Sequence, residues 1–395
     1  MSLTRPLIAL LTASLALSFF TACGEEVEAE NQSPNQNQVD PENQSQNQTE
    51  SECPAGQRLN PFTGACVDEE EFEVPEENQN QPEENQNQGE NQPQLECGPG
   101  SLIGQACATD GNRLPAATVQ LVGVDCEGIP FERVTETDGN GTFFFSDVPS
   151  GSHELRVVSG SFESERPVDI FAGEETSLMS DAEKVCLDGD VNIMIFQSTW
   201  DDIGSLLDNL ELDYTSLNDN TAIANLLSDP AALNEYDIIF VECSRGWGSL
   251  SGDTETMAAN LRAFVENGGS LYGADLALSY ITAAFPEVAT YPSVSYGGNT
   301  VNADVVSSAM QSLLQSNTVS ISFNTELRGI SNLNPGAVIH FTAGSSPPSS
   351  FQANTPLMIS YPVPGGGTVI SSAFHNRPGA TPEITEIMSF MVFQL

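Results

Sequence analysis

The chain has 395 residues, of which 55 are acidic and 11 are basic, so its formal net charge at pH 7 is -44. This length is enough for two or three domains. A surface this negative repels nucleic acids and anionic lipid headgroups, which excludes polyanions as binding partners.

Two explanations of the acidity remain open. Acidic residues keep a protein soluble, and hydrated carboxylates also suit a high-salt habitat, where screening removes the repulsion between like charges. Lys184 is the only lysine of the chain, and this scarcity favours the high-salt explanation. Binding of divalent cations is a weaker third explanation.

Residues 1–22 have the pattern of an export signal. Arg5 supplies a positive charge, and an apolar run of about fifteen residues follows, shorter than the ~20 that a transmembrane helix needs. The sequence Phe20-Thr21-Ala22-Cys23 then resembles the lipobox of bacterial lipoproteins. That resemblance implies cleavage before Cys23 and its acylation, hence a membrane anchor, and Gly24 favours the outer membrane or cell surface over the inner membrane. The alternative is an ordinary signal peptide cut after Ala22.

Residues 23–96 are rich in Glu, Asn, Gln and Pro, as in EENQNQPEENQNQGENQPQ. Almost no apolar residue is available to offset the entropy of ordering, so we expect a disordered, extended stalk. Cys53 and Cys66 bracket a short segment within it, and a local disulfide is the expected arrangement. We expect such a stalk to hold the folded domains away from the membrane.

Residues 97–187 show alternating strands and turns. ATVQLVGV alternates apolar and polar residues, and DGNG within TETDGNGTFFFSDVPSGSHELRVVSG is turn chemistry. Several short strands at this spacing predict a small β-sandwich. His153 is expected to face solvent as a single polar residue within a strand. Four cysteines can form two bridges with three possible pairings; these are Cys97, Cys107, Cys126 and Cys186.

The stretch TDGNGTFFFSDVPSGSHELRV resembles the signature of carboxypeptidase-regulatory-like (Cna-B-type) domains. This resemblance implies a prealbumin-like sandwich that serves as a spacer or an adhesive unit and not as an enzyme. Some relatives form a Lys–Asn isopeptide bond, but Lys184 stands at the end of the domain, which argues against one here.

Residues 190–395 alternate buried strands with helices. VNIMIFQS, YDIIFVECS and SLYGADLAL are apolar runs typical of strands buried on both faces, and TETMAANLRAFVENGG has helical spacing that ends in glycine. This order predicts an α/β domain of three layers, with a parallel sheet covered by helices on both faces. We expect residues 290–356 to be an elaboration of that domain, in which His340 packs within a strand.

This half resembles class I glutamine amidotransferase-like domains. The likeness rests on YDII, on FVENGG and on the ending GGGTVISSAFHNRPGATPEITEIMSFMVFQL. Enzymes of that family carry a nucleophilic cysteine on a G-x-C-x-G elbow, where this chain has Ala274 or Asp275. The family's histidine resembles His375, but Arg377 stands at the place of the following glutamate. Two of the three catalytic residues are therefore missing, and amidotransferase chemistry is not expected.

A candidate pocket follows from the strand ends, because ligands of open α/β sheets bind beyond the carboxyl ends of the strands. Its predicted members are Cys243, Arg245, Asp275 and His375. Cys243 is expected to be a buried free thiol. The alternative is a hydrolase or amidase that uses Cys243 or Asp275 with His375. The absence of a CxxC motif argues against zinc, and no cofactor is expected.

These observations predict an extracytoplasmic lipoprotein of the cell envelope. Its expected role is binding or adhesion, and its partners are the membrane, through the lipid, and a protein, peptide or glycan.

Overall fold

The computed structural model describes residues 57–59, 66–68 and 97–395, except 244, 325 and 378–379. The two short stretches are antiparallel strands, β1 (Gln57–Leu59) and β2 (Cys66–Asp68), in a unit separate from the rest. The predicted signal peptide, Cys23 and the expected Cys53–Cys66 bridge fall outside the described residues. Within the described part, no helix has the length and apolar character needed to cross a membrane.

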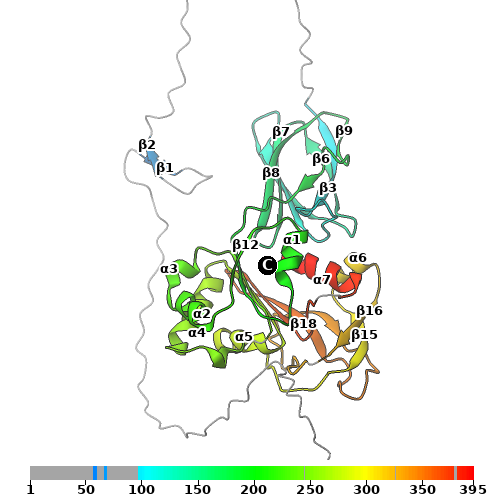
Figure 1. Cartoon of the computed structure of the whole chain (residues 1–395). Helices are drawn as coiled ribbons and strands as arrows, with labels where there is room; N and C mark the ends of the chain where they lie inside the picture. The colour runs from blue at the N-terminus through cyan, green and yellow to red at the C-terminus, as the bar shows by residue number, and fades with distance from the viewer. Residues whose placement is uncertain (1–56, 60–65, 69–96, 244, 325, 378–379) are drawn as a thin grey trace, which may run out of the picture. The chain divides into compact units, whose positions relative to one another are not determined.

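Residues 99–186 form a β-sandwich of two sheets (Figure 1). One sheet has the order β5-β4-β7-β8, and in the other β3 pairs with β6, β9 and β10. The strands are β3 (Pro99–Cys107), β4 (Thr118–Val124), β5 (Pro130–Glu136), β6 (Thr142–Pro149), β7 (Gly151–Ser159), β8 (Phe162–Ile170), β9 (Glu175–Leu178) and β10 (Val185–Cys186).

Alternate side chains of these strands fill the space between the two sheets. Phe143 and Phe145 of β6 point inward, and Leu155 and Val157 of β7 meet them from the other sheet. Two disulfides close the sandwich, and the structure selects the pairing that the sequence left open: Cys97–Cys126 and Cys107–Cys186.

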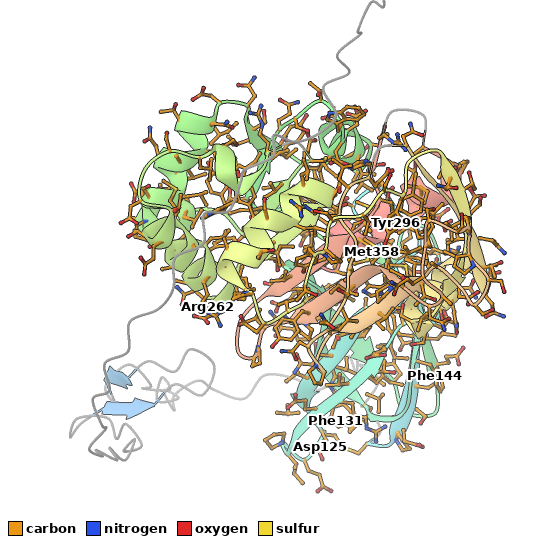
Figure 2. The ribbon with its side chains drawn as sticks, turned by 90° about the horizontal axis from the view of Figure 1, so that it is seen from below. Asp125, Phe131, Phe144, Arg262, Tyr296 and Met358 are labelled. Carbon is orange, nitrogen blue, oxygen red and sulfur yellow. A yellow bond between two sulfur atoms is a disulfide. The ribbon has the colours of Figure 1, made fainter. Side chains whose placement is uncertain are left out.

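His153 corrects the sequence-based expectation, because it faces the core and not the solvent. It is only 3% exposed, and its Nε2 lies 2.7 Å from the carbonyl oxygen of Pro149. The ring meets the edge of Phe131, a residue of β5 that Figure 2 shows on the sandwich. Gly123 stands opposite His153 in the strand pair, and a Cβ there would collide with the imidazole. The ring thus occupies the space that glycine leaves.

The second half contains a nine-stranded sheet in the order β12-β11-β13-β14-β19-β18-β17-β15-β16. Only the first five strands run parallel, so the expected parallel sheet is a mixed one. The antiparallel part comes from β15 to β18, which the elaboration after residue 290 supplies. The strands are β11 (Ile193–Phe196), β12 (Tyr214–Leu217), β13 (Ile238–Val241), β14 (Ser270–Ala274), β15 (Asn299–Val305), β16 (Thr318–Phe323), β17 (Val338–Thr342), β18 (Pro356–Pro362) and β19 (Thr368–Ser372).

Polar residues cap the N-termini of several helices. Asp219, Asp253 and Thr381 accept backbone N–H bonds at the first turns of α2, α4 and α7. Pro230 interrupts the helical run TAIANLLSDPAALN, and α3 restarts there under an Asp229 cap. The helices are α1 (Ile203–Asn209), α2 (Asn220–Ser228), α3 (Pro230–Leu233), α4 (Thr254–Glu266), α5 (Leu278–Ala284), α6 (Ser308–Leu314) and α7 (Pro382–Val392), with 3-10 turns η2 (Trp247–Ser249) and η3 (Asp275–Ala277).

The helices cover both faces of the parallel part. The chain moves from β11 outward to β12 and then back across the sheet to β13 and β14. Right-handed crossovers in opposite directions place their helices on opposite faces. Figure 1 accordingly shows α2, α3, α4 and α5 on one side of the sheet and α1 and α7 on the other.

The sandwich and the α/β domain form one compact unit. Phe162 of β8 packs against Phe393 with ring centroids 4.9 Å apart, and Oγ of Ser159 donates a hydrogen bond to the Phe393 carbonyl. Gly160, at φ +57°, turns between β7 and β8, and a Cβ there would lie 2.6 Å from backbone atoms of Leu395. Only glycine fits this turn without strain.

Candidate functional site

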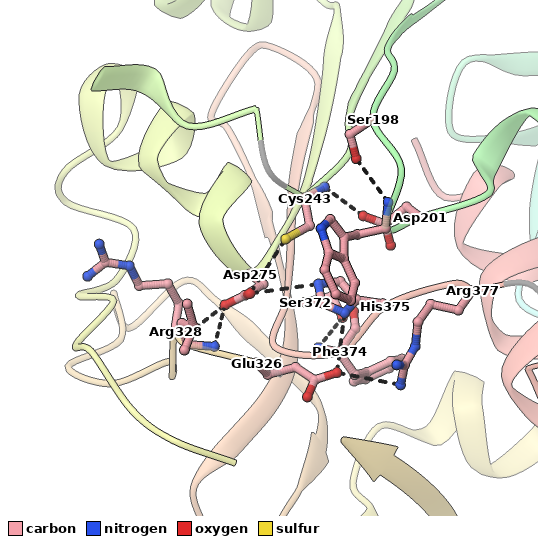
Figure 3. Close-up of polar contacts among 12 residues, drawn as sticks. Ser198, Asp201, Cys243, Asp275, Glu326, Arg328, Ser372, Phe374, His375 and Arg377 are labelled. Atoms are coloured by element: carbon pink, nitrogen blue, oxygen red, sulfur yellow. Dashed lines mark hydrogen bonds and ion pairs between the residues drawn. The ribbon is translucent and has the colours of Figure 1, made fainter. Parts of the chain in front are cut away.

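The candidate site lies where the parallel strands end. β11, β13, β14 and β19 are neighbours in register, so the residues that follow them meet at one edge of the sheet. Figure 3 shows Asp201, Cys243, Asp275 and His375 brought together there. Three of the four predicted pocket residues belong to this group.

The sequence allowed either Ala274 or Asp275 at the elbow position, and in the structure Asp275 occupies it. It directly follows β14 and has φ +46°, a left-handed conformation that side-chain-bearing residues seldom adopt. Its Oδ1 accepts the backbone N–H groups of Leu327 and Arg328 at 2.9 and 2.7 Å. The residue is 0% exposed, and burial raises the pKa of its carboxyl to about 6.

His375 lies between two carboxylates. Its Nε2 is 3.8 Å from Oδ2 of Asp275, and its Nδ1 is 3.2 Å from Oε1 of Glu326. The side chains of all three residues are 0% exposed. Burial alone lowers the pKa of His375, but the charges of Asp201, Glu326 and Asp275 outweigh it, so the pKa is raised overall. The imidazole thus lies between two acids whose charges favour its protonated form.

Glu326 was not identified from the sequence. It lies in the segment between β16 and β17, and Arg377 approaches its Oε1 at 3.7 Å. Neither carboxylate oxygen has a hydrogen-bond partner in the described part of the chain, so ion pairs alone compensate its charge. Arg377, which stands where the resemblance leads one to expect a glutamate, thus supports a glutamate from another segment.

Two more buried acids complete the cluster. The carboxylate of Asp201 accepts the N–H groups of Cys243 and Asn376, and burial raises its pKa. The carboxylate of Glu242 accepts the N–H groups of Ser198 and Ile203, and burial raises its pKa to about 7. Both acids bridge neighbouring strand ends and hold the loops of the sheet edge together.

Cys243 corrects a second expectation. Its sulfur is part of a disulfide and is not a free thiol, and the four cysteines of the sandwich pair with one another. The sulfur lies 3.5 Å from Oδ2 of Asp275, and donor atoms of Cys243, Asp275 and His375 fall within 4.8 Å of one another. Since a disulfide sulfur supplies neither a thiolate nucleophile nor a thiolate ligand, this proximity does not make Cys243 a reactive group.

Arg245, the fourth predicted member, does not join the cluster. Its guanidinium donates to the carbonyl oxygens of Gln197 and Asn218 and to Oδ1 of Asn220. These bonds connect the ends of β11 and β12 with the start of α2. Arg245 therefore joins these loops through hydrogen bonds.

Two cavities in the described part of the chain lie away from the cluster. Each has a volume of about 530 Å³, and neither is lined by Asp201, Asp275, Glu326 or His375. The first lies against α7 and the second near the start of β14. These two cavities are thus separate from the chemistry-bearing residues.

His340 is packed within β17, as expected. It is 6% exposed, and its two ring nitrogens lie within 3.0 Å of the hydroxyls of Ser307 and Ser360. Burial lowers its pKa to about 4, so the ring is neutral at pH 7.

A signal in the sequence could have identified two of the missed acids. Glu242 follows the apolar residues of DIIFVEC, and Asp201 follows VNIMIFQSTW, so both stand just beyond predicted strands. Acids at such positions reach the ligand edge of a parallel sheet. Glu326 has no comparable signal, because only the tertiary fold brings its segment to that edge.

No family model matches the chain, and none of the curated proteins matches it. Several solved structures are similar to parts of it. A protein from Thermoplasma acidophilum, assigned as one component of a GMP synthase, shares 12% identity over 52% of this chain and 94% of its own, with a TM-score of 0.37. A glutamine amidotransferase from Thermotoga maritima shares 11% over 47% and 75%, with a TM-score of 0.31. A protein assigned as carbohydrate-binding from Pseudomonas aeruginosa shares 14% over 21% and 90%, with a TM-score of 0.17.

Glutamine amidotransferase-like proteins are thus among the structures similar to about half of this chain. Identities this low concern the fold alone, so function has to be argued from the geometry of this chain.

Proposed function

We propose that the chain is an extracytoplasmic lipoprotein, tethered to the outer membrane or cell surface through a lipid on Cys23. Its α/β domain binds a protein, peptide or glycan without catalysing a reaction, and its sandwich is a spacer or an adhesive unit. The observation that carries this proposal is the elbow residue, because a buried, ion-paired carboxylate stands where the resembled enzymes place their nucleophile.

The surroundings of His375 support a binding role. A general base must accept a proton from the nucleophile, and a rise in the pKa of the imidazole that favours its protonated form works against this task. The charges of Asp201, Glu326 and Asp275 raise the pKa of His375 in this way.

The contacts of Asp275 support the same conclusion. Both oxygens of the Asp275 carboxylate are engaged, Oδ1 by two backbone N–H groups and Oδ2 by the approach of His375. Neither of the two cavities described above is lined by Asp275. A substrate would have to displace this network before it could touch the acid.

Catalysis is tested by exposing peptide and glycan arrays to the labelled full chain and to its Asp275→Asn variant. We expect both proteins to bind the same ligands, and mass spectrometry to recover those ligands unchanged. A product formed by the wild type and not by the variant would overturn the binding role.

Anchoring is tested in the native host by metabolic labelling with palmitate. Wild type is compared with Cys23→Ser and with Cys53→Ser, a matched control that removes a different cysteine near the N-terminus. We expect label and membrane association to be lost only in Cys23→Ser. An unlabelled, released wild-type protein would refute the lipid anchor.

A second candidate function is hydrolysis by Asp275, and one observation favours it. Asp275, His375 and Glu326 stand in the order nucleophile, base and orienter. In such a reaction Oδ2 of Asp275 attacks the substrate carbon, the bond from that carbon to the leaving atom breaks, and a covalent ester or anhydride forms on Asp275. Water that gives its proton to His375 then attacks the carboxyl carbon of Asp275, the bond from that carbon to Oδ2 breaks, and Oδ2 leaves with the product, so one solvent oxygen remains on Asp275. Incubation with esters, amides and epoxides in H₂¹⁸O would add ¹⁸O to the peptide that contains Asp275, and its absence would exclude this route.

A further inference from the structure

A cavity of about 530 Å³ lies between the loop that joins β3 to β4 and helix α7. Its lining comes from residues 108–114 of the sandwich and residues 380–393 of the α/β domain, with Leu210 and Leu313 between them. Small-molecule sites have volumes of roughly 300–1,000 Å³ and often lie between domains. The space therefore has the size and the place of a ligand site, and it is remote from the buried cluster.

One wall of the cavity is apolar. Leu114, Leu210, Leu313, Phe390 and Phe393 line it, and each is 4% exposed or less. These side chains are fixed by the core on their far sides, as the packing of Phe393 on Phe162 shows. A ligand that fills this space must carry an apolar body.

The charges of the cavity favour a cation. Arg113 lies 3.1 Å from Glu386 and also donates to the carbonyl oxygen of Leu313, so its charge is already compensated. The carboxylate of Asp110 also lines the cavity, and its contacts are with the backbone N–H and the amide of Asn112, both neutral donors. One negative charge is left over, and the net charge of -44 adds a negative field around the site.

We propose that this cavity binds a small organic cation with an apolar body, such as an aryl or alkyl ammonium compound. Asp110 supplies the counter-charge, and Phe390 and Phe393 supply aromatic carbon, which attracts cations as well as apolar groups. The inference goes beyond the proposed function, because it assigns a small-molecule ligand to a space away from the buried cluster.

Calorimetric titration of the full chain with phenyltrimethylammonium tests the proposal, and benzenesulfonate is the probe of similar body and opposite charge. We expect saturable binding of the cation and none of the anion. Asp110→Asn keeps an acceptor for Asn112 and should weaken the cation roughly fivefold. Ser389→Phe, which fills the cavity from α7, should abolish binding while thermal melting shows that the variant folds.

Asp125→Asn is the matched control. Asp125, labelled in Figure 2, accepts backbone N–H groups in the β4–β5 turn much as Asp110 does in its own turn, but it does not line the cavity. The Asp125→Asn variant should bind the cation with the same affinity as the wild type. Absence of saturable binding, equal affinity for the anion, or equal weakening by Asp110→Asn and Asp125→Asn would overturn the proposal. None of these results depends on turnover at Asp275 or on acylation of Cys23, so failure here is distinct from failure of the proposed function.

Discussion

Replacement of Asp275 by asparagine should change how the stability of the α/β domain depends on pH. Asparagine retains an oxygen for the N–H groups of Leu327 and Arg328. It also tolerates the left-handed backbone that φ +46° requires at this position. The substitution therefore removes a buried titratable group and keeps the backbone contacts of this position.

The magnitude follows from the pKa of the buried acid. Burial raises the pKa of Asp275 from 3.8 to about 6, and each pKa unit corresponds to ~1.4 kcal/mol. A raised folded-state pKa means that the stabilising contribution is complete below pH 3.8 and is lost as pH rises through 6. Between pH 4 and pH 7, the wild type should lose about 2 to 3 kcal/mol relative to Asp275→Asn through this group.

Other buried groups titrate in the same range, but they are present in both proteins. Burial raises the pKa of Glu242 to about 7, so this acid also destabilises the fold as pH rises. Burial lowers the pKa of His340 to about 4, which acts in the opposite direction, with stability lost as pH falls through 4. The difference between wild type and variant removes both effects.

Urea unfolding at several pH values, followed by tryptophan fluorescence, measures this difference. Both tryptophans, Trp200 and Trp247, lie in the α/β domain, so the signal reports on that domain alone. Asp219→Asn, at the exposed cap of α2, controls for the loss of one negative charge from the chain. If the stability curves of wild type and Asp275→Asn run parallel from pH 4 to pH 7, Asp275 is not the buried titrating acid inferred here.

Three further predictions concern the stability of the whole unit. Replacing Cys107 and Cys186 by alanine opens a link between residues 79 apart and should cost about 4 kcal/mol of unfolding free energy, measured by denaturant titration; a cost near zero would contradict the closing role of this bridge. Phe393→Ala should cost about 3 to 5 kcal/mol because it empties the contact with Phe162, and an unchanged urea midpoint would contradict that contact. Raising salt from low to molar concentration should raise the melting temperature steeply, since it screens the net charge of -44, whereas a flat response would argue against adaptation to high salt.

The strands that the sequence identifies best are those buried on both faces. The runs around Ile193–Phe196, Ile238–Val241 and Ser270–Ala274 are continuously apolar, and no surface helix or turn has that pattern. β3 was not anticipated, because glycines interrupt its alternation, and β5 escaped notice because every one of its residues is at least partly exposed. A strand can be recognised from the burial pattern of its sequence only where many of its side chains are buried.

The antiparallel half of the sheet has a different reason for being missed. β15 and β16 are rich in serine, asparagine and threonine, which by composition also describe a loop. Their inward residues alternate correctly, as in Val319, Ile321 and Phe323, but the alternation becomes decisive only once a partner strand is known. The sequence therefore indicated an elaboration of the domain without indicating that it extends the sheet.

The order of the strands allowed part of the site to be predicted, because it determines which residues follow the strands at one edge of the sheet. Asp275 and His375 could be placed at one edge because each follows a strand of the parallel set, and the structure brings them within 3.8 Å. Arg245 follows a parallel strand too, yet it turns toward the loops of Asn218 and Asn220. Strand order determines where a backbone segment ends, whereas the direction of a long side chain depends on the acceptors around it.

Charge compensation explains how several acids can be buried together at the edge of the sheet. Each carboxylate is compensated by groups from other segments: Asp275 by His375 and two backbone N–H groups, Glu326 by His375 and Arg377. Removing one partner of a buried ion pair leaves the other charge uncompensated, at a cost of about 3 to 5 kcal/mol. The charged groups of this cluster therefore depend on one another, and together they hold the strand ends in place. The same network of buried charges thus positions the loops at the edge of the sheet and stabilises the domain.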